Sequence, residues 1–118
     1  MLPAPNRLRE RSDFTSAVRS FGGCRAGSRL LVVHATSTGA RAGLPPRVGF
    51  VVSKAVGGAV VRNRTKRRLR ALVAQRLDGI PTSVDLVVRA NPPAGQASSR
   101  ELQQALDPLL RRVVKGLG

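Results

Sequence analysis

The sequence predicts one small α+β domain whose elements follow the order helix, strand, strand, helix, strand, helix. The chain has 118 residues, a common length for a single domain. Apolar residues make up 42% of it, which is enough to fill a compact core. Short runs of β-branched residues alternate with longer stretches in which apolar residues recur at helical spacing. Such a mixture is typical of the α+β class.

The N-terminal part predicts a basic arm followed by a short helix. Residues 1–11 are irregular in pattern and contain two prolines. Ser12 has the side chain of an N-cap, and Asp13 falls in the first turn, where a negative charge is favoured. The apolar residues that follow have the i, i+3, i+4, i+7 spacing of a buried helix face: Phe14, Ala17, Val18 and Phe21.

Three β-branched runs predict strands, over residues 29–35, 47–53 and 84–89. We expect the first two to form an antiparallel hairpin across the turn-rich connection between them. Residues 22–29 leave room for a short extra strand, and the sequence does not decide whether one forms.

Two further helices are predicted, one over about residues 59–77 and one from Ser98 to the C-terminal region. Ser98 and Glu101 have the spacing of a capping box. Pro108 interrupts the second helix, and the sequence is compatible either with a kink or with a restart capped by Asp107. The buried stripe of this helix is expected to consist of Leu102, Leu106, Leu109, Leu110 and Val113.

The charge predicts a polyanionic partner. Twenty-one basic and six acidic residues give a net charge of +15, and nucleic acid is the most common counterpart of such a surface. Tyr and Trp are absent, so arginine contacts to phosphates are favoured over base stacking on aromatic side chains.

A single histidine, His34, and a single cysteine, Cys24, argue against a histidine metal site and a disulfide. No secretory signal or membrane span is expected, so we expect a cytoplasmic location.

The most informative segment is the predicted helix at residues 59–77. Six of the nine residues 62–70 are basic and none is acidic, although like charges four residues apart destabilise an isolated helix. Solvated helix faces usually mix both signs, so this one predicts an anionic partner. A solvated face and a helix that targets calmodulin or a membrane surface are the alternatives.

This segment resembles the "RNR" signature of the bacterial ribonuclease P protein family. The matching pattern is Lys54-x-x-Gly57-x-Ala59-Val60-x-Arg62-Asn63-Arg64-x-Lys66-Arg67-x-x-Arg70. Asn6-Arg7-Leu8 with Asp13-Phe14, and Arg47-Val48-Gly49 running into Ser53-Lys54, also resemble the family. The resemblance covers nearly the whole chain, which we take as one domain over residues 1–118.

The resemblance implies a fold similar to the second domain of ribosomal protein S5. Its central mixed sheet would contain a left-handed β–α–β crossover, where right-handed crossovers are the rule. The implied activity is removal of the 5′ leader from precursor tRNA by a ribonucleoprotein endonuclease. The implied partners are the ribonuclease P RNA subunit and precursor tRNA, with no membrane and no protein partner required. The RNA subunit and substrate would hold the Mg²⁺ ions and carry the chemistry, so no catalytic or metal residue is assigned to the protein.

The resemblance also implies two sets of binding residues. Contacts to the RNA subunit would come from Arg62, Asn63, Arg64, Lys66, Arg67 and Arg70. A cleft for the single-stranded leader would be lined by Phe14, Val18, Val33, Arg47, Phe50, Ser53, Lys54 and Arg89. The family often has aromatic residues at the positions of Val18 and Val33, and a second basic residue at that of Ala55. The chain departs from it there.

Two other functions fit part of this pattern. A ribosomal or general RNA-binding protein without a processing role would share the charge. A protein-only nuclease would need paired carboxylates, which the six acidic residues of the sequence do not provide.

Overall fold

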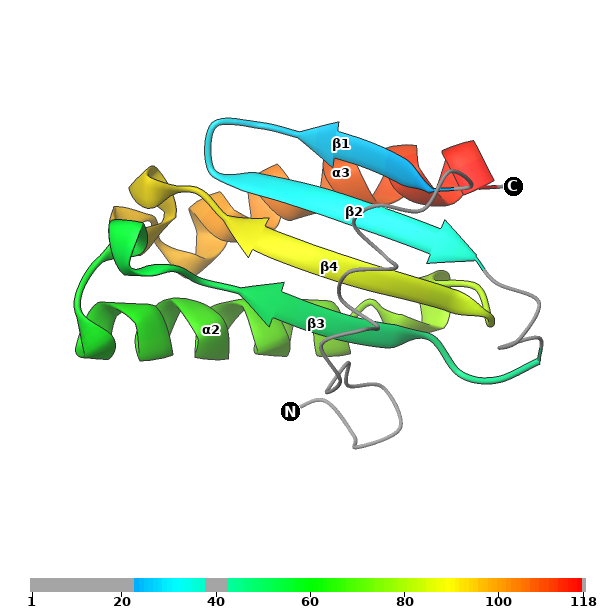
Figure 1. The fold of residues 1–118 in the computed structure, drawn as a ribbon, viewed down its shortest axis with the longest axis horizontal. Coiled ribbons are helices and arrows are strands. Elements are labelled where there is room, and N and C mark those ends of the chain that lie inside the picture. Colours follow the sequence, from blue (N-terminus) through cyan, green and yellow to red (C-terminus); the bar gives the residue numbers. More distant parts are fainter. Residues whose placement is uncertain (1–22, 38–42, 118) are drawn as a thin grey trace.

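Residues 23–37 and 43–117 are described by the computed structural model of this chain, and they form a four-stranded sheet with two α-helices on one face (Figure 1). The strands are β1 (Cys24–Gly27), β2 (Leu31–Ser37), β3 (Arg47–Val51) and β4 (Val84–Ala90). β1 is the short extra strand that the sequence left undecided. The helix predicted around Phe14 lies outside the described residues.

The strand order is β1-β2-β4-β3, so the predicted hairpin of the second and third strands is wrong. β4 lies between them, antiparallel to β2 and parallel to β3. The physical reason is the apolar character of β4, in which every residue except Arg89 is buried. A strand buried on both faces is most stable in the middle of a sheet, where both of its edges are paired.

The connection from β3 to β4 passes through the helix α2 (Ala59–Ala74) and is left-handed, as the family resemblance implied. In Figure 1, β3 and β4 both run from right to left, β4 lies above β3, and α2 lies behind the sheet. α2 ends three residues earlier than predicted, and a 3₁₀ turn at Leu77–Gly79 follows it. Two more 3₁₀ turns, at Lys54–Val56 and Pro92–Gln96, precede α2 and α3.

The last helix, α3 (Ser99–Leu117), begins with the predicted capping box. The Ser98 N–H donates to Glu101 Oε1 at 3.0 Å, and the Glu101 N–H donates to Ser98 Oγ at 3.1 Å. The helix continues through Pro108, so the restart at Asp107 does not occur. Asp107 instead binds Arg76, and the predicted stripe of α3 is buried.

The core lies between the sheet and these two helices. Because side chains alternate along a strand, Leu31, Val33 and Ala35 of β2 all point to the same face, and all three are fully buried. They belong to one cluster with Leu69 of α2 and Leu106 of α3. Arg47, His34 and Arg89 belong to the alternate set of positions, and we call the face they occupy, turned away from α2 and α3, the outer face.

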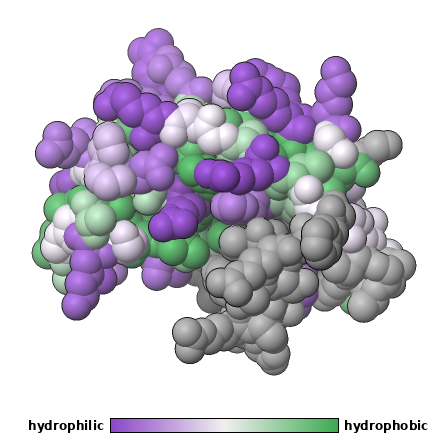
Figure 2. Space-filling model, turned by 45° about the horizontal axis from the view of Figure 1, so that its top comes forward, coloured by the Kyte–Doolittle hydropathy of each residue, from purple (hydrophilic) through white to green (hydrophobic). Residues whose placement is uncertain are grey.

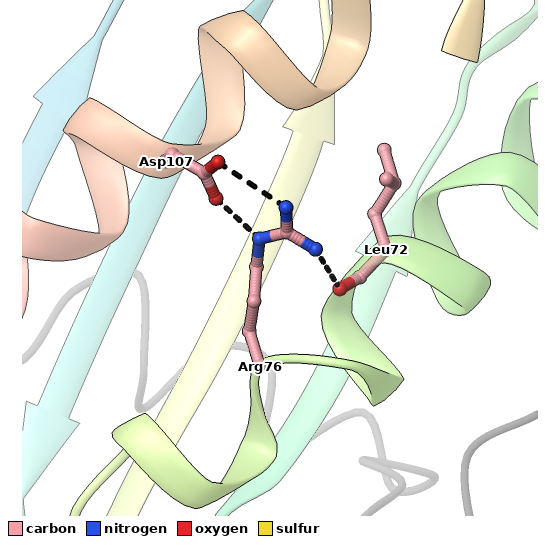
Figure 3. Close-up of polar contacts among 3 residues, drawn as sticks. All are labelled: Leu72, Arg76 and Asp107. Atoms are coloured by element: carbon pink, nitrogen blue, oxygen red, sulfur yellow. Dashed lines mark hydrogen bonds and ion pairs between the residues drawn. The ribbon is translucent and has the colours of Figure 1, made fainter. Parts of the chain in front are cut away.

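Arg76 links the end of α2 to the middle of α3 (Figure 3). Its Nε and Nη2 atoms donate to the two carboxylate oxygens of Asp107, the second at 3.2 Å, and its Nη1 donates to the Leu72 carbonyl oxygen at 2.8 Å. The guanidinium of Arg76 is therefore used within the protein, where it joins the end of α2 to α3.

Candidate RNA-binding surface

α2 turns one side to the core and leaves the other to solvent. Its buried positions are Thr65, Leu69, Leu72 and Val73. Thr65 is nearly inaccessible and donates its hydroxyl to the Val61 carbonyl oxygen at 2.9 Å, so its polar atom is satisfied within the helix. This apolar side fixes the rotation of the helix, and the rotation determines which basic residues face outward.

The outward side brings together four residues that the sequence assigned to RNA binding. Asn63, Lys66, Arg67 and Arg70 follow the i, i+3, i+4, i+7 spacing of one helix face. They surround a shallow hollow of about 560 Å³ together with Val60, whose side chain is 78% exposed. We call these four residues the outer row. Three of them are exposed and Lys66 is half-buried.

Two other arginines of α2 turn toward the protein. Arg64 Nη2 donates to the Gly95 carbonyl oxygen at 3.1 Å, and Arg68 Nη1 donates to the Ala97 carbonyl oxygen at 2.8 Å. Both side chains are half-buried, as is Arg62. Arg64 and Arg68, which we call the inner pair, therefore fasten α2 to the segment that leads into α3.

The segment held by the inner pair is tightly packed. A Cβ atom at Gly95 would lie 2.4 Å from the Val56 carbonyl oxygen, closer than any real side chain approaches. The 3₁₀ turn around Gly95 therefore lies directly against the turn that carries Lys54 and Val56. Glycine makes this close approach possible, and the contact joins the region before α2 to the region before α3.

A second hollow, of about 430 Å³, opens between α2 and the start of α3. Basic side chains from α2 and Ser99 of α3 lie around it, and the lining residues are Arg64, Arg67, Arg68, Ala71, Leu72, Gln75 and Ser99. Arg67 lines both hollows. The outer row and the inner pair therefore form one continuous basic surface with two shallow depressions.

The charge on this surface is not neutralised by the described carboxylates. Asp85 accepts two hydrogen bonds from Arg47, at 2.9 and 2.8 Å, and Asp107 binds Arg76. Glu101 belongs to the capping box of α3. In the described ranges no carboxylate forms an ion pair with residues 62–70. Uncompensated charge of one sign attracts a polyanion and steers its approach.

The residues assigned to the leader cleft are not brought together as one lining. Val33 is fully buried and Phe50 packs against the core, both on the face that carries the helices. Arg47 and Arg89 lie on the outer face, because each directly neighbours a core residue, Val48 or Val88, and side chains alternate along a strand. Ser53 and Lys54 are exposed just beyond β3. Phe14 and Val18 lie outside the described residues.

Sequence reasoning assigned Arg64 to the RNA subunit and did not single out Arg68 or Gly95. The four-residue spacing of Arg64 and Arg68 indicated only that they share a side of the helix. Their partners are backbone carbonyls about thirty residues further along the chain, and no residue type marks such acceptors.

The described residues hold no group of three His, Cys, Asp or Glu side chains suited to a metal ion. Nor does any helix within them combine the length and apolar character needed to cross a membrane.

Comparison with known proteins identifies the family. The family model described as Ribonuclease P matches residues 2–114. The chain belongs to the ribonuclease P protein family. It is similar to a ribonuclease P protein component from Streptomyces bikiniensis, with 52% identity over 98% of each chain.

Solved structures of ribonuclease P proteins share the fold. The protein from Staphylococcus aureus superposes with a TM-score of 0.80 at 27% identity, covering 92% of this chain and 97% of that one. The protein from Thermotoga maritima, solved in complex with 1-(4-fluorophenyl)-2-thiourea, gives a TM-score of 0.78 at 27% identity, covering 91% and 99%. The family membership makes the chain a component of an RNA-processing endoribonuclease that acts on tRNA, and it disfavours a general RNA-binding role without processing.

Proposed function

We propose that this chain binds the catalytic RNA of ribonuclease P through the outer row of α2 and guides the 5′ leader of precursor tRNA along the other side of the protein. The observation that carries the proposal is the exposed basic face of α2, which lacks a carboxylate partner within the described residues. Arginine is suited to this role because its planar fork binds phosphate oxygens bidentately.

The two groups of arginine on α2 take different roles in this proposal. The outer row contacts the phosphates of the RNA subunit, with Asn63 adding a neutral polar contact. Arg64 and Arg68 hold the 92–97 segment against α2, so that the basic surface keeps one shape as RNA approaches. Arg62 lies at the edge of the contact, since it is half-buried. A rigid surface loses less conformational entropy when it binds.

The leader would pass over Ser53, Lys54 and Arg89. Ser53 and Lys54 are exposed in the turn after β3. Arg89 of β4 is also exposed, and it pairs with Val51, the last residue of β3. Lys54 and Arg89 supply charge for phosphates, and Phe50 supports the turn from within. Val33, with no exposed surface, supports the sheet and is not part of the proposed contact.

Magnesium ions held by the RNA subunit and the substrate would supply the hydrolytic chemistry in the assembled enzyme. The part proposed for this chain is binding and orientation of RNA, in the cytoplasm and without a further protein partner. The basic surface also lowers the repulsion between two polyanions, the catalytic RNA and the precursor, which must come together.

Reconstitution tests the proposal. The chain is combined with a bacterial ribonuclease P RNA, and cleavage of precursor tRNA is measured at a low Mg²⁺ concentration with and without protein. We expect strong stimulation by the protein and no cleavage by the protein alone. A folded protein that fails to stimulate the RNA would favour a general RNA-binding role, and cleavage by the protein alone would indicate a protein nuclease.

A further inference from the structure

The segment that connects β4 to α3, residues 91–97, is held at both ends, and we call it the bridge segment. Asn91 Nδ2 donates to the Ser28 carbonyl oxygen at 3.0 Å, which ties the first end to the turn between β1 and β2. The inner pair ties the second end to α2 through the carbonyl oxygens of Gly95 and Ala97. Most of the segment is a 3₁₀ turn, whose internal hydrogen bonds have poorer geometry than those of an α-helix, so these side-chain contacts determine its position.

The middle of the bridge segment lies against the turn that carries Lys54. A Cβ atom at Gly95 would lie 2.4 Å from the Val56 carbonyl oxygen and 3.0 Å from Val61 Cγ1, so the backbone there touches both this turn and the first turn of α2. Within the turn the Gly57 N–H donates to the Lys54 carbonyl oxygen at 3.2 Å. The position of Lys54 therefore depends on the position of Gly95.

These contacts gather at one end of the sheet. The 3₁₀ turn after β3, the 3₁₀ turn of the bridge segment and α2 each contact the other two. In Figure 1 both turns and the start of α2 lie at the left end of the sheet. Figure 2, in which this end is again on the left, shows pale and apolar residues between strongly hydrophilic ones there. The bridge segment thus joins the start of α2 to the turn that carries Lys54.

Arg64 is directed into the protein, unlike the outer row. Its side chain is half-buried and its Nε atom is covered, whereas Arg67, one turn further along α2, is exposed. Because that Nε is covered, a phosphate cannot form the side-on pair of hydrogen bonds through which arginine often binds oxyanions. Arg64 is therefore placed to act on the bridge segment rather than on RNA.

We propose that Arg64 is a positioning residue for leader binding: by holding the Gly95 carbonyl oxygen it fixes the bridge segment, and the bridge segment fixes the turn that presents Lys54. The proposal rests on the proposed function, in which the leader passes over Lys54. It gives Arg64 a role different from the RNA-subunit contact that the family signature implies. A binding group that is displaced by a small distance loses much of its effect, so Arg64 influences the leader without touching it.

The test compares precursor and mature tRNA in the reconstituted holoenzyme. The measured quantity is the precursor preference, which is the dissociation constant of mature tRNA divided by that of precursor tRNA. Arg64→Met keeps the aliphatic stem and removes the donor, and it should lower the precursor preference by roughly three- to tenfold. The affinity for the RNA subunit should fall by less than about twofold, because the outer row is intact.

Arg67→Met is the matched control, since it removes the same charge from an exposed position of the same helix. It should reduce the slope of log affinity for the RNA subunit against log salt by about one. Its effect on the precursor preference should be smaller than that of Arg64→Met. If Arg64→Met reduces the salt slope as much as Arg67→Met does, Arg64 contacts RNA directly and the proposal is overturned.

Gly95→Ala disturbs the same path without removing a charge. The new Cβ would push the bridge segment away from the Val56 carbonyl oxygen, so the precursor preference should fall as it does in Arg64→Met. Gly79→Ala, whose Cβ position has no atom within 4 Å, should keep the wild-type preference. Thermal unfolding establishes that each variant is folded at the assay temperature. A folded Gly95→Ala protein with the wild-type preference would contradict the proposed path, and Arg64→Met decides the matter if Gly95→Ala does not fold.

A double-mutant cycle with Lys54→Gln separates the positioning role from the leader role. Lys54→Gln should itself lower the precursor preference, and adding Arg64→Met should cause less than about twofold further loss, because the side chain that Arg64 positions is gone. Full additivity of the two losses would overturn the proposal. If the wild type shows no precursor preference, or Lys54→Gln does not lower it, the leader role of this turn fails and the positioning role fails with it. If Lys54→Gln lowers the preference and Arg64→Met does not, only the positioning role is wrong.

Discussion

The two helices behind the sheet differ in how well they follow the rules of helix stability. α3 begins with a reciprocal capping box, has Glu101 in its first turn and Lys115 in its last. The N-cap residue of α2 is Gly58, which offers no side-chain cap, and the first turn of the helix contains no acidic residue. Charged residues of one sign then follow each other along its exposed side. The residues of α3 stabilise their own helix, whereas α2 depends on contacts with other parts of the molecule for its stability.

The difference indicates where function opposes stability. A cap and an acidic first turn would each stabilise α2 by a fraction of a kcal/mol to about 1 kcal/mol. A carboxylate at that end would also repel a phosphate backbone. α2 instead gains its stability from the buried Leu69 and Val73 and from the hydrogen bonds of the inner pair. Departures from local rules of this kind are expected at functional sites.

The largest effect is expected for the double substitution Arg67→Gln and Arg70→Gln. It should weaken binding to the RNA subunit by roughly tenfold or more and reduce the slope of log affinity against log salt by about two. The thermal midpoint should not fall, because repulsion between like charges on the helix is relieved. Filter binding over a salt series and thermal unfolding measure the two effects.

The matched control for that variant is Arg111→Gln with Arg112→Gln, which removes the same charge from exposed positions of α3. If both double variants lower the salt slope equally, net charge rather than the outer row determines RNA binding. An unchanged slope in the α2 variant would place the RNA interface on another surface.

Gly95→Ala tests the packing that supports the basic surface. Because the new Cβ would meet the Val56 carbonyl oxygen at 2.4 Å, we expect a loss of about 1–3 kcal/mol in the free energy of unfolding. Gly79→Ala is the control, since no atom lies within 4 Å of the Cβ position there. Chemical denaturation of both variants measures the difference, and equal stabilities would contradict the tight approach.

Ser98→Ala removes the cap of α3 and should lower the free energy of unfolding by about 1 kcal/mol.

Hydrogen bonds from the backbone and side chain of Ser98 lower the pKa of Glu101 below its ordinary value of 4.5. The stabilisation by ionised Glu101 is therefore present above that value and is lost as pH falls through the lower pKa of the folded state. The difference in thermal midpoint between wild type and Glu101→Gln should follow this course, and a difference independent of pH would exclude the carboxylate.

The smallest effect is expected at the start of α2. Gly58 has a φ of −70° and no atom within 4 Å of its Cβ position, so a side chain fits there. Gly58→Ser and Gly58→Asp should both raise the stability of the helix by a few tenths of a kcal/mol. Only the aspartate adds negative charge next to the proposed RNA contact, so it alone should weaken RNA binding. Equal affinities for the two variants would show that this end of α2 does not approach RNA.

Patterns within a single element predicted most of the fold. The capping box of α3, its buried stripe and the apolar side of α2 depend on spacing along one helix, which the sequence displays directly. The pairing of strands cannot be seen in the spacing along one element, because it depends on which apolar run can be buried on both faces. For that reason β4 displaced the expected hairpin of residues 29–35 and 47–53.

The candidate site was predicted as a set of residue types and not as a geometry. Four residues of the signature, Asn63, Lys66, Arg67 and Arg70, lie around one hollow on α2. The signature did not separate them from Arg64, whose partner is a backbone carbonyl on a distant loop. Val33 and Arg89 were assigned to one cleft, although strand alternation directs them to opposite faces.

The central place of β4 determines when the chain can fold during synthesis. Within the sheet β2 and β3 are joined only through β4, so the sheet on which α2 packs is incomplete until residues 84–90 have been synthesised. Pairings between distant segments are slow to form, because the intervening loop must be closed first. The basic segment of α2 is therefore made before the central strand of the sheet on which it packs, and the core can close only after β4 and α3 have followed.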